Sequence, residues 1–146
     1  MKKGRNFTMK KVIGFTAGAF DMFHVGHLNL IKNAKARCDY LIVGVNTDEL
    51  ITSYKNKHAI VPLEERMQIV GAVKYVDEVI SVDTLDKEAI WAKKMFDIVF
   101  IGDDWKGSER WNETEQVMSK HSVAVVYLPY TIGTTSTVLR EKLMML

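Results

Sequence analysis

Short apolar segments alternate along this chain with longer segments that have apolar positions at helical spacing. The apolar segments are rich in β-branched residues, and several of them are apolar throughout instead of alternating with polar residues. Continuous apolar runs of this length are typical of strands that are covered on both faces. We therefore predict five strands, over residues 12–16, 40–46, 78–82, 97–102 and 123–128.

The segments between the strands have the spacing of helices. Leu28 and Ile31 mark one apolar face, and Pro62 fits the first turn of a helix whose apolar side holds Leu63, Met67 and Val70. Repeated alternation of strand and helix with short connections predicts an α/β fold, a Rossmann-like doubly wound five-stranded parallel sheet with helices on both faces. We predict helices over residues 27–37, from 62 onward, and over 86–96, 109–120 and 136–144.

Composition limits the functions open to this fold. The chain has 146 residues, 47% of them hydrophobic and 26% charged, which is the balance of a soluble globular domain. A formal charge of +2 gives no reason to expect a nucleic acid or a membrane as partner. Cys38 is the single cysteine, and no apolar run approaches 18 residues, so we expect a cytoplasmic enzyme or binding protein. We interpret residues 1–8 as a disordered extension or expression remnant, and residues 9–146 as one domain.

Unusual polar stretches follow the predicted strands. "GAFDMFHVGH" (18–27) follows the first strand, "NTDE" (46–49) the second, "GDDW" (102–105) the fourth and "LPYTIGTTST" (128–137) the fifth. In an open parallel sheet, ligands bind beyond the carboxyl ends of the strands. This edge of the sheet is therefore the candidate active site.

The first of these stretches places two histidines three residues apart at the predicted start of a helix. Two imidazoles there, with Gly18 and Gly26 allowing close approach, are suited to donate hydrogen bonds to phosphate oxygens beside free helix N–H groups. One core and one surface histidine is the simpler alternative. A zinc site is a third, although His58 and His121 are remote in sequence.

Four motifs in order resemble one known family. "AFDMFHVGH" resembles the G-x-F-D-x-x-H-x-G-H form of the HxGH nucleotidyltransferase signature, and "KYVDEV" (74–79), "GDDW" and "GTTST" (133–137) resemble R-Y-V-D-E-V, GDDW and G-I-S-T-T. The chain is therefore similar, over about residues 10–143, to the cytidylyltransferase branch of that superfamily, and within it to the bacterial glycerol-3-phosphate enzymes. Residues 9–146 would then form a single nucleotidyltransferase domain.

The resemblance implies a reaction and a set of site residues. CMP would pass from CTP to a small alcohol phosphate, most plausibly glycerol-3-phosphate, in a cytoplasmic homodimer. Mg²⁺ would be held mainly by the nucleotide phosphates, so no residue is assigned as a certain metal ligand. The implied catalytic residues are His24, His27, Lys55 and Lys57. The implied nucleotide-binding residues are Ala17, Gly18, Ala19, Phe20, Asp21, Gly26, Arg66, Asp103, Asp104, Thr135 and Ser136. The implied acceptor-binding residues are Lys74, Asp77, Trp105, Tyr130 and Thr131.

Simpler interpretations of these residues remain open. Lysines in "YKNK" are ordinary in a solvated loop, "GTTST" is suited to cap any helix, and "GDDW" fits an exposed turn. Two positions also depart from the family pattern. Lys74 replaces arginine and loses its planar fork for phosphate, and Tyr130 stands where glycerol-3-phosphate enzymes carry arginine.

Other functions fit the same pattern. Phosphocholine, phosphoethanolamine or another polyol phosphate would serve as acceptor with unchanged chemistry, and Tyr130, Trp105 and Trp111 leave a cationic acceptor open. An adenylyltransferase that uses ATP, a nucleotide-binding regulatory module without turnover, and a flavodoxin-like interaction domain are the remaining alternatives.

Overall fold

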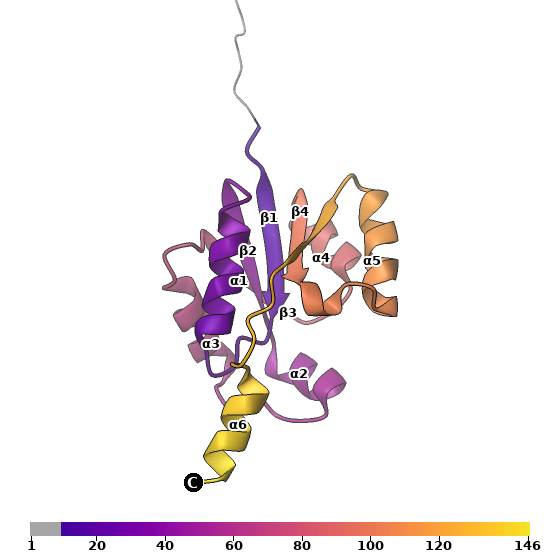
Figure 1. Cartoon of the computed structure of the whole chain (residues 1–146). Helices are drawn as coiled ribbons and strands as arrows, with labels where there is room; N and C mark the ends of the chain where they lie inside the picture. Colours follow the sequence, from indigo (N-terminus) through magenta and orange to yellow (C-terminus); the bar gives the residue numbers. More distant parts are fainter. Residues whose placement is uncertain (1–9) are drawn as a thin grey trace, which may run out of the picture.

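A five-stranded parallel sheet forms the centre of the molecule (Figure 1). The structure is a computed structural model, and it describes residues 10–146. The strands lie in the order β3-β2-β1-β4-β5. Their bounds are β1 Ile13–Gly18, β2 Tyr40–Asn46, β3 Glu78–Val82, β4 Ile98–Gly102 and β5 Ala124–Leu128. Each predicted strand is present, and every bound agrees within two residues.

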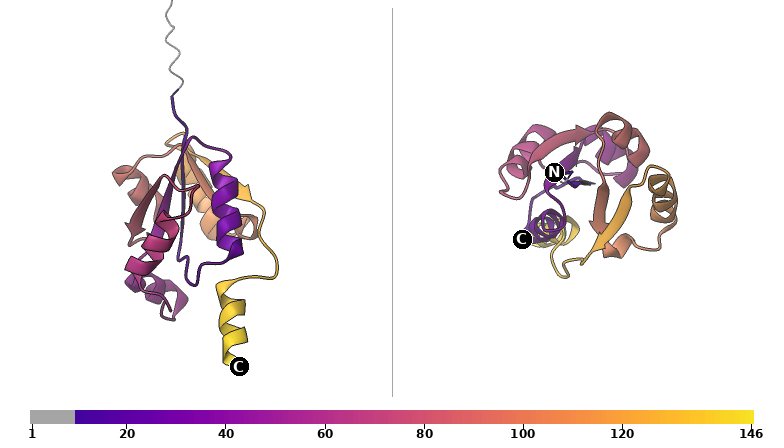
Figure 2. Two further views of the ribbon diagram at one scale, coloured as in Figure 1. Left: turned by 90° about the vertical axis from the view of Figure 1, so that its left-hand side faces the viewer. Right: turned by 90° about the horizontal axis from the view of Figure 1, so that it is seen from above.

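Helices cover both faces of this sheet, as Figure 2 shows. They are α1 Val25–Lys35, α2 Asp48–Lys55, α3 Leu63–Gly71, α4 Lys87–Lys93, α5 Glu109–Ser119 and α6 Ser136–Met144, with a 3₁₀ turn, η1, at Asp103–Trp105. The doubly wound α/β fold predicted from the sequence is therefore confirmed. Within residues 10–146, none of the helices has both the length and the apolar character needed to cross a bilayer.

Two hydrophobic clusters form because alternate strand residues face opposite sides. Phe15 of β1 packs with α4 and α5 on one face, where its ring stacks on Phe96 at 4.7 Å between centroids. Phe100 of β4 packs with α1 and α3 on the other face. The central strands β1, β2 and β4 are thus covered on both faces, which explains their long apolar runs.

Helix α2 was not predicted, because its sequence is mostly polar. It lies over the segment that the sequence analysis interpreted as the polar "NTDE" and "YKNK" stretches. Thr47 caps the helix by accepting a hydrogen bond from Leu50 N, and Asp48 and Glu49 provide negative charge in its first turn. Only Ile51 is buried, so the hydrophobic pattern is too weak to reveal the helix.

The sheet opens between β1 and β4. Strand β1 pairs with β2 along its whole length, but it pairs with β4 only at Gly14↔Ile98 and Phe15↔Val99. Beyond these pairs, Thr16 Oγ1 donates to Phe100 O at 3.0 Å in place of a ladder bond. The strand order changes direction at this point, so the diverging carboxyl ends of β1 and β4 form the crevice in which this fold class binds ligands.

Two glycines provide a matched test of the core. A Cβ at Gly44 would lie 2.5 Å from Val82 Cγ2 and 3.0 Å from Phe15 Cζ, whereas a Cβ at Gly71 would meet nothing closer than Val79 Cγ1 at 3.5 Å. We expect Gly44→Ala to lower the free energy of unfolding by about 1–3 kcal/mol through overpacking. Gly71→Ala, at the end of α3, should raise it by up to about 1 kcal/mol. Urea unfolding checks both, and equal effects at the two positions would contradict this packing.

Candidate active site

Two cavities meet at the carboxyl edge of the sheet. The larger, of about 290 Å³, lies between the start of α1, the η1 turn and the segment joining β5 to α6. The smaller, of about 140 Å³, lies between the end of β1, the end of α2 and the first turns of α6. Both cavities are lined by His27, Leu30, Lys55, Ser136 and Thr137. These five residues form a shared wall at which two ligands can meet.

His24 and His27 are fixed by the backbone at the start of α1. His24 is the N-cap residue, and its Nδ1 accepts a hydrogen bond from Gly26 N at 3.0 Å. His27 Nδ1 accepts from His24 N at 3.2 Å, and the two rings stack with centroids 3.8 Å apart. In a neutral imidazole, a nitrogen that accepts carries no proton, so each ring keeps its proton on Nε2. Both histidines therefore offer an Nε2–H donor to a ligand.

Burial keeps these imidazoles neutral. It lowers the pKa of His27 to about 3, with the nearby His24 and Lys55 lowering it further and Asp21 opposing them. Burial also lowers the pKa of His24 from its ordinary value of 6.5. Near neutral pH the pair thus donates hydrogen bonds without adding charge.

The glycine between the two histidines allows this packing. A Cβ at Gly26 would lie 2.9 Å from His24 Cε1 and 3.3 Å from Thr134 O. Before the helix, Phe20 and Met22 have φ angles of 52° and 49°, a conformation that is costly for L-residues and persists only where surrounding contacts impose it. Phe20 supplies such contacts, since it is buried and its ring lies 5.3 Å from that of His27.

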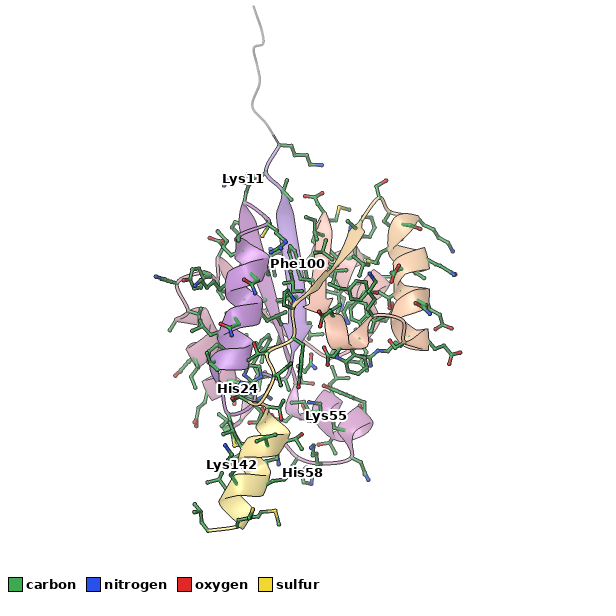
Figure 3. All side chains as sticks on the ribbon, viewed as in Figure 1. Lys11, His24, Lys55, His58, Phe100 and Lys142 are labelled. Atoms are coloured by element: carbon green, nitrogen blue, oxygen red, sulfur yellow. The ribbon has the colours of Figure 1, made fainter. Side chains whose placement is uncertain are left out.

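The two predicted lysines lie at the end of α2. Lys55 is the last residue of the helix, as Figure 3 shows. It lines both cavities, whereas Lys57 lines the smaller one. Asn56 between them ends the helix in the left-handed conformation, with φ of 55°. Burial and the charge of Lys57 lower the pKa of Lys55, and Asp21 opposes them. The two ammonium groups thus repel each other, and a bound anion would reduce this repulsion.

Asp21, in the loop after β1, connects three segments of the chain. Its buried carboxylate accepts hydrogen bonds from Ile60 N at 2.8 Å, Val61 N at 2.9 Å and Arg140 Nη2 at 2.8 Å. Its carbonyl oxygen accepts from Ser136 Oγ.

Arg66, which the resemblance assigns to the nucleotide, does not line either cavity. The side chain is 1% exposed. Its guanidinium donates to Val61 O at 2.7 Å, Ala19 O at 2.8 Å and Asn46 O at 2.7 Å, and it pairs with Asp48. Arg66 therefore lies beneath the site and fixes the backbone of the loops above it.

Most other predicted site residues line the cavities. Thr135 caps α6 by accepting from Val138 N, and Thr131 accepts from Asn29 Nδ2 at 3.0 Å. Asp103 lines neither cavity but accepts from Tyr130 N at 3.1 Å. The larger cavity is also lined by His24, Gly26, Asp104, Trp105, Tyr130, Thr131 and Thr135. The smaller one is also lined by Ala17, Gly18, Ala19, Phe20 and Asp21.

Lys74 and Asp77 lie at the opposite edge of the sheet and line neither cavity, so their assignment to the acceptor stays a prediction. Asp77 accepts from Leu41 N at the start of β2 and pairs with Lys35 at the end of α1. The histidines lie at the other end of α1, and an 11-residue helix is about 16 Å long.

Residues that the sequence analysis missed also contribute. Arg140 and Ile51 line the smaller cavity, and Leu30 and Thr137 line both. Arg140 follows Ser136 by four residues, which places both on one face of α6, and this spacing was the available signal. Among the residues that the structure describes, no three His, Cys, Asp or Glu side chains form a metal-binding group, so the zinc alternative finds no support there.

Comparison with known proteins identifies the family. The family model described as cytidylyltransferase-like matches residues 15–142. This chain belongs to the cytidylyltransferase-like family. Its members that match over most of the chain are nucleotidyltransferases, and so is this protein.

The individual relatives of this nucleotidyltransferase carry the names of different enzymes. The chain is 38% identical to a glycerol-3-phosphate cytidylyltransferase of Bacillus subtilis (strain 168), over 92% of this chain and 98% of that one. It is 37% identical to an FAD synthase of Thermococcus onnurineus (strain NA1), over 83% and 81%. A solved structure of a lipopolysaccharide core biosynthesis protein from Thermoplasma volcanium GSS1 has a TM-score of 0.71 at 24% identity, covering 86% of this chain and all of that one, and shows the shared fold.

The neutral state of His27 predicts a pH dependence of stability. The unfolded chain takes up a proton at His27 near its ordinary pKa of 6.5, whereas the folded chain does so only near 3. The free energy of unfolding should therefore fall as the pH drops from about 6.5 toward 3. Urea unfolding at several pH values should show a shallower fall in His27→Gln. The same fall in both proteins would contradict the assignment, as would loss of the neutral Nε2–H tautomer by NMR at pH 5.

The buried guanidinium predicts a stability difference between two arginines. Arg66→Met leaves Val61 O, Ala19 O and Asn46 O without their donor, and we expect the free energy of unfolding to fall by about 3–5 kcal/mol. Arg37→Met is the matched control, because Arg37 is exposed and its side chain's one hydrogen bond among residues 10–146 goes to Asn33 O; its effect should stay within about 0.5 kcal/mol. Denaturant unfolding measures both, and a small loss for Arg66→Met would show that the loops hold without it.

Proposed function

We propose that this protein transfers CMP from CTP to glycerol-3-phosphate, giving CDP-glycerol and pyrophosphate. The observation that carries the proposal is the shared wall of the two cavities, where neutral His27 and cationic Lys55 face both compartments. The similarity to the Bacillus subtilis enzyme, which extends over nearly the full length of both chains, supports the choice of substrates.

The proposed chemistry is an in-line displacement at the α-phosphorus. A phosphate oxygen of the acceptor forms the new bond to this phosphorus, and the bond to the oxygen bridging the α- and β-phosphorus breaks, so pyrophosphate leaves with that electron pair. The attacking oxygen is already anionic at neutral pH and needs no protein base. The chain's task is positioning and charge stabilisation, supplied by the Nε2–H donors of His24 and His27 and by Lys55 and Lys57.

The residues around the cavities fit a magnesium ion that arrives with the nucleotide. The carboxylate of Asp21 is committed to two backbone N–H groups and Arg140, and burial raises the pKa of Asp104. Mg²⁺ keeps most of its waters and binds substrate phosphates in sites with few protein carboxylates. The ion would neutralise phosphate charge, while His24, His27 and the two lysines would hold the phosphates themselves.

A cationic acceptor is the second candidate, because Asp104, Trp105 and Tyr130 line the larger cavity. An aromatic face and a carboxylate are suited to bind a choline or ethanolamine head group. The guanidinium of Arg110, however, already lies 4.7 Å from the centroid of the Trp105 ring. The smaller cavity carries Lys55, Lys57 and Arg140 against the single carboxylate of Asp21, which favours an acceptor with no positive charge.

We further infer that the enzyme works as a cytoplasmic homodimer. The family resemblance supports this state, and Val25, Ile60 and Met144 are exposed apolar side chains, of a kind that association with a second copy would remove from water. Sedimentation of the purified protein measures the association directly.

Pyrophosphate release with CTP and Mg²⁺ tests the proposed reaction. The acceptors are glycerol-3-phosphate, ribitol-5-phosphate, phosphocholine and phosphoethanolamine, with ATP replacing CTP in a parallel series. We expect release with CTP and glycerol-3-phosphate, and a loss of about 10²–10³ in rate for His27→Ala. His121→Ala is the control, because His121 pairs with Glu88 and stacks on Trp91, away from both cavities.

Three other outcomes would overturn parts of this proposal. Turnover with ATP alone would point to the chemistry named for the Thermococcus relative. Release only with phosphocholine or phosphoethanolamine would reassign the acceptor. Release that His27→Ala does not reduce would remove the imidazole from the mechanism.

A further inference from the structure

Arg140 connects the last helix to the loop that follows α2. Its Nη2 donates to Asp21 Oδ2 at 2.8 Å and to His58 O at 3.0 Å. The side chain of Asp21 is 6% exposed and that of Arg140 is 23% exposed, so water screens this ion pair only in part. A single guanidinium nitrogen thus bridges α6, the loop after β1 and the loop 56–62.

The loop 56–62 is held mainly by side chains from other elements. The carboxylate of Asp21 accepts from the N–H groups of Ile60 and Val61, and Arg66 donates to Val61 O. Arg140 adds the bond to His58 O. The loop carries Lys57, so its backbone position sets where that ammonium group lies, and it begins directly after Lys55, the last residue of α2.

Helix α6 itself has few attachments to the body. None of its residues is buried, and in Figures 1 and 2 it extends away from the sheet below the start of α1. Ser136 Oγ donates to Asp21 O at its first turn, and Arg140 makes the next contact one turn later. The pairing of Arg140 with Asp21 therefore fastens α6 and the loop 56–62 to the same carboxylate.

We propose that Arg140 is a positioning residue, and that the Arg140–Asp21 pair is a latch that holds the loop 56–62, and with it Lys55 and Lys57, against the shared wall of the two cavities. The effect of this latch on turnover rests on the proposed function, whereas its effect on the position of the loop does not. The competing role is direct: Arg140 also lines the smaller cavity and could bind a substrate phosphate itself.

Hydrogen exchange of the free protein tests the latch without any substrate. In Arg140→Met, the amides of Ile60 and Val61 should exchange about tenfold faster or more, because opening of the loop no longer breaks the bridge to α6. Lys142→Met is the matched control: it removes one positive charge from the same helix at a residue that makes no contact with Asp21, and it should leave both amides unchanged. Unchanged exchange at Ile60 and Val61 in Arg140→Met would overturn the proposal.

A double-mutant cycle separates positioning from direct binding. Misplaced lysines should lower kcat by about 10- to 100-fold in Arg140→Met and in Asp21→Asn, with a smaller change in KM. If the two residues act as one latch, the double variant should be no slower than the slower single variant. Arg140→Lys, which keeps a donor for Asp21, should recover part of both kcat and amide protection. Effects that multiply in the double variant, or a loss confined to KM, would assign Arg140 to the substrate instead.

The two proposals fail separately. If the wild-type protein releases no pyrophosphate with any pair of substrates, the proposed function fails, while the exchange of Ile60 and Val61 still decides the latch. If turnover is normal and Arg140→Met changes neither exchange nor kcat, the latch fails and the reaction stands.

Discussion

The buried guanidinium of Arg66 needs hydrogen-bond acceptors for its N–H groups, and the arrangement of the loops at the carboxyl edge of the sheet depends on this requirement. Its carbonyl partners belong to the loop after β1, the end of β2 and the loop before α3. A buried cation thus organises the loops, and Asp21 provides the complementary buried anion above it, accepting from N–H groups of the same region.

At the start of α1, the same side-chain atoms serve more than one purpose. The hydrogen bonds that cap this helix use Nδ1 of His24 and of His27, and in doing so they decide which nitrogen of each ring carries the proton. The hydrogen bonds that cap the helix therefore also set the tautomer of each ring and leave its Nε2–H free to bind a ligand. This coupling explains why the glycine lies between the histidines: the backbone must approach the His24 ring more closely than a Cβ allows.

Much of this structure could be predicted from the sequence, and the features that could not be predicted have physical causes. The strands could be predicted because burial on both faces requires long runs of β-branched residues. Helix α2 buries only Ile51, so its sequence has no hydrophobic periodicity from which a helix could be predicted. Arg66 was assigned to the ligand because a charged residue in sequence gives no sign that carbonyl groups will surround it. Lys74 and Asp77 precede β3, and residues that precede a parallel strand lie at its amino end; this rule, applied to the "KYVDEV" segment, would have placed them correctly.

The limited pairing of β1 with β4 bears on how this family diversifies. The crevice lies where the two strands stop pairing after two residue pairs, so its position follows from the backbone of the sheet. Substitutions at exposed rim positions such as Trp105 or Tyr130 can therefore be sampled by evolution at little cost to folding. In such a fold, substitutions can change which substrate is preferred without changing the fold itself. This agrees with the comparison, in which two relatives of similar identity to this chain are named for different reactions.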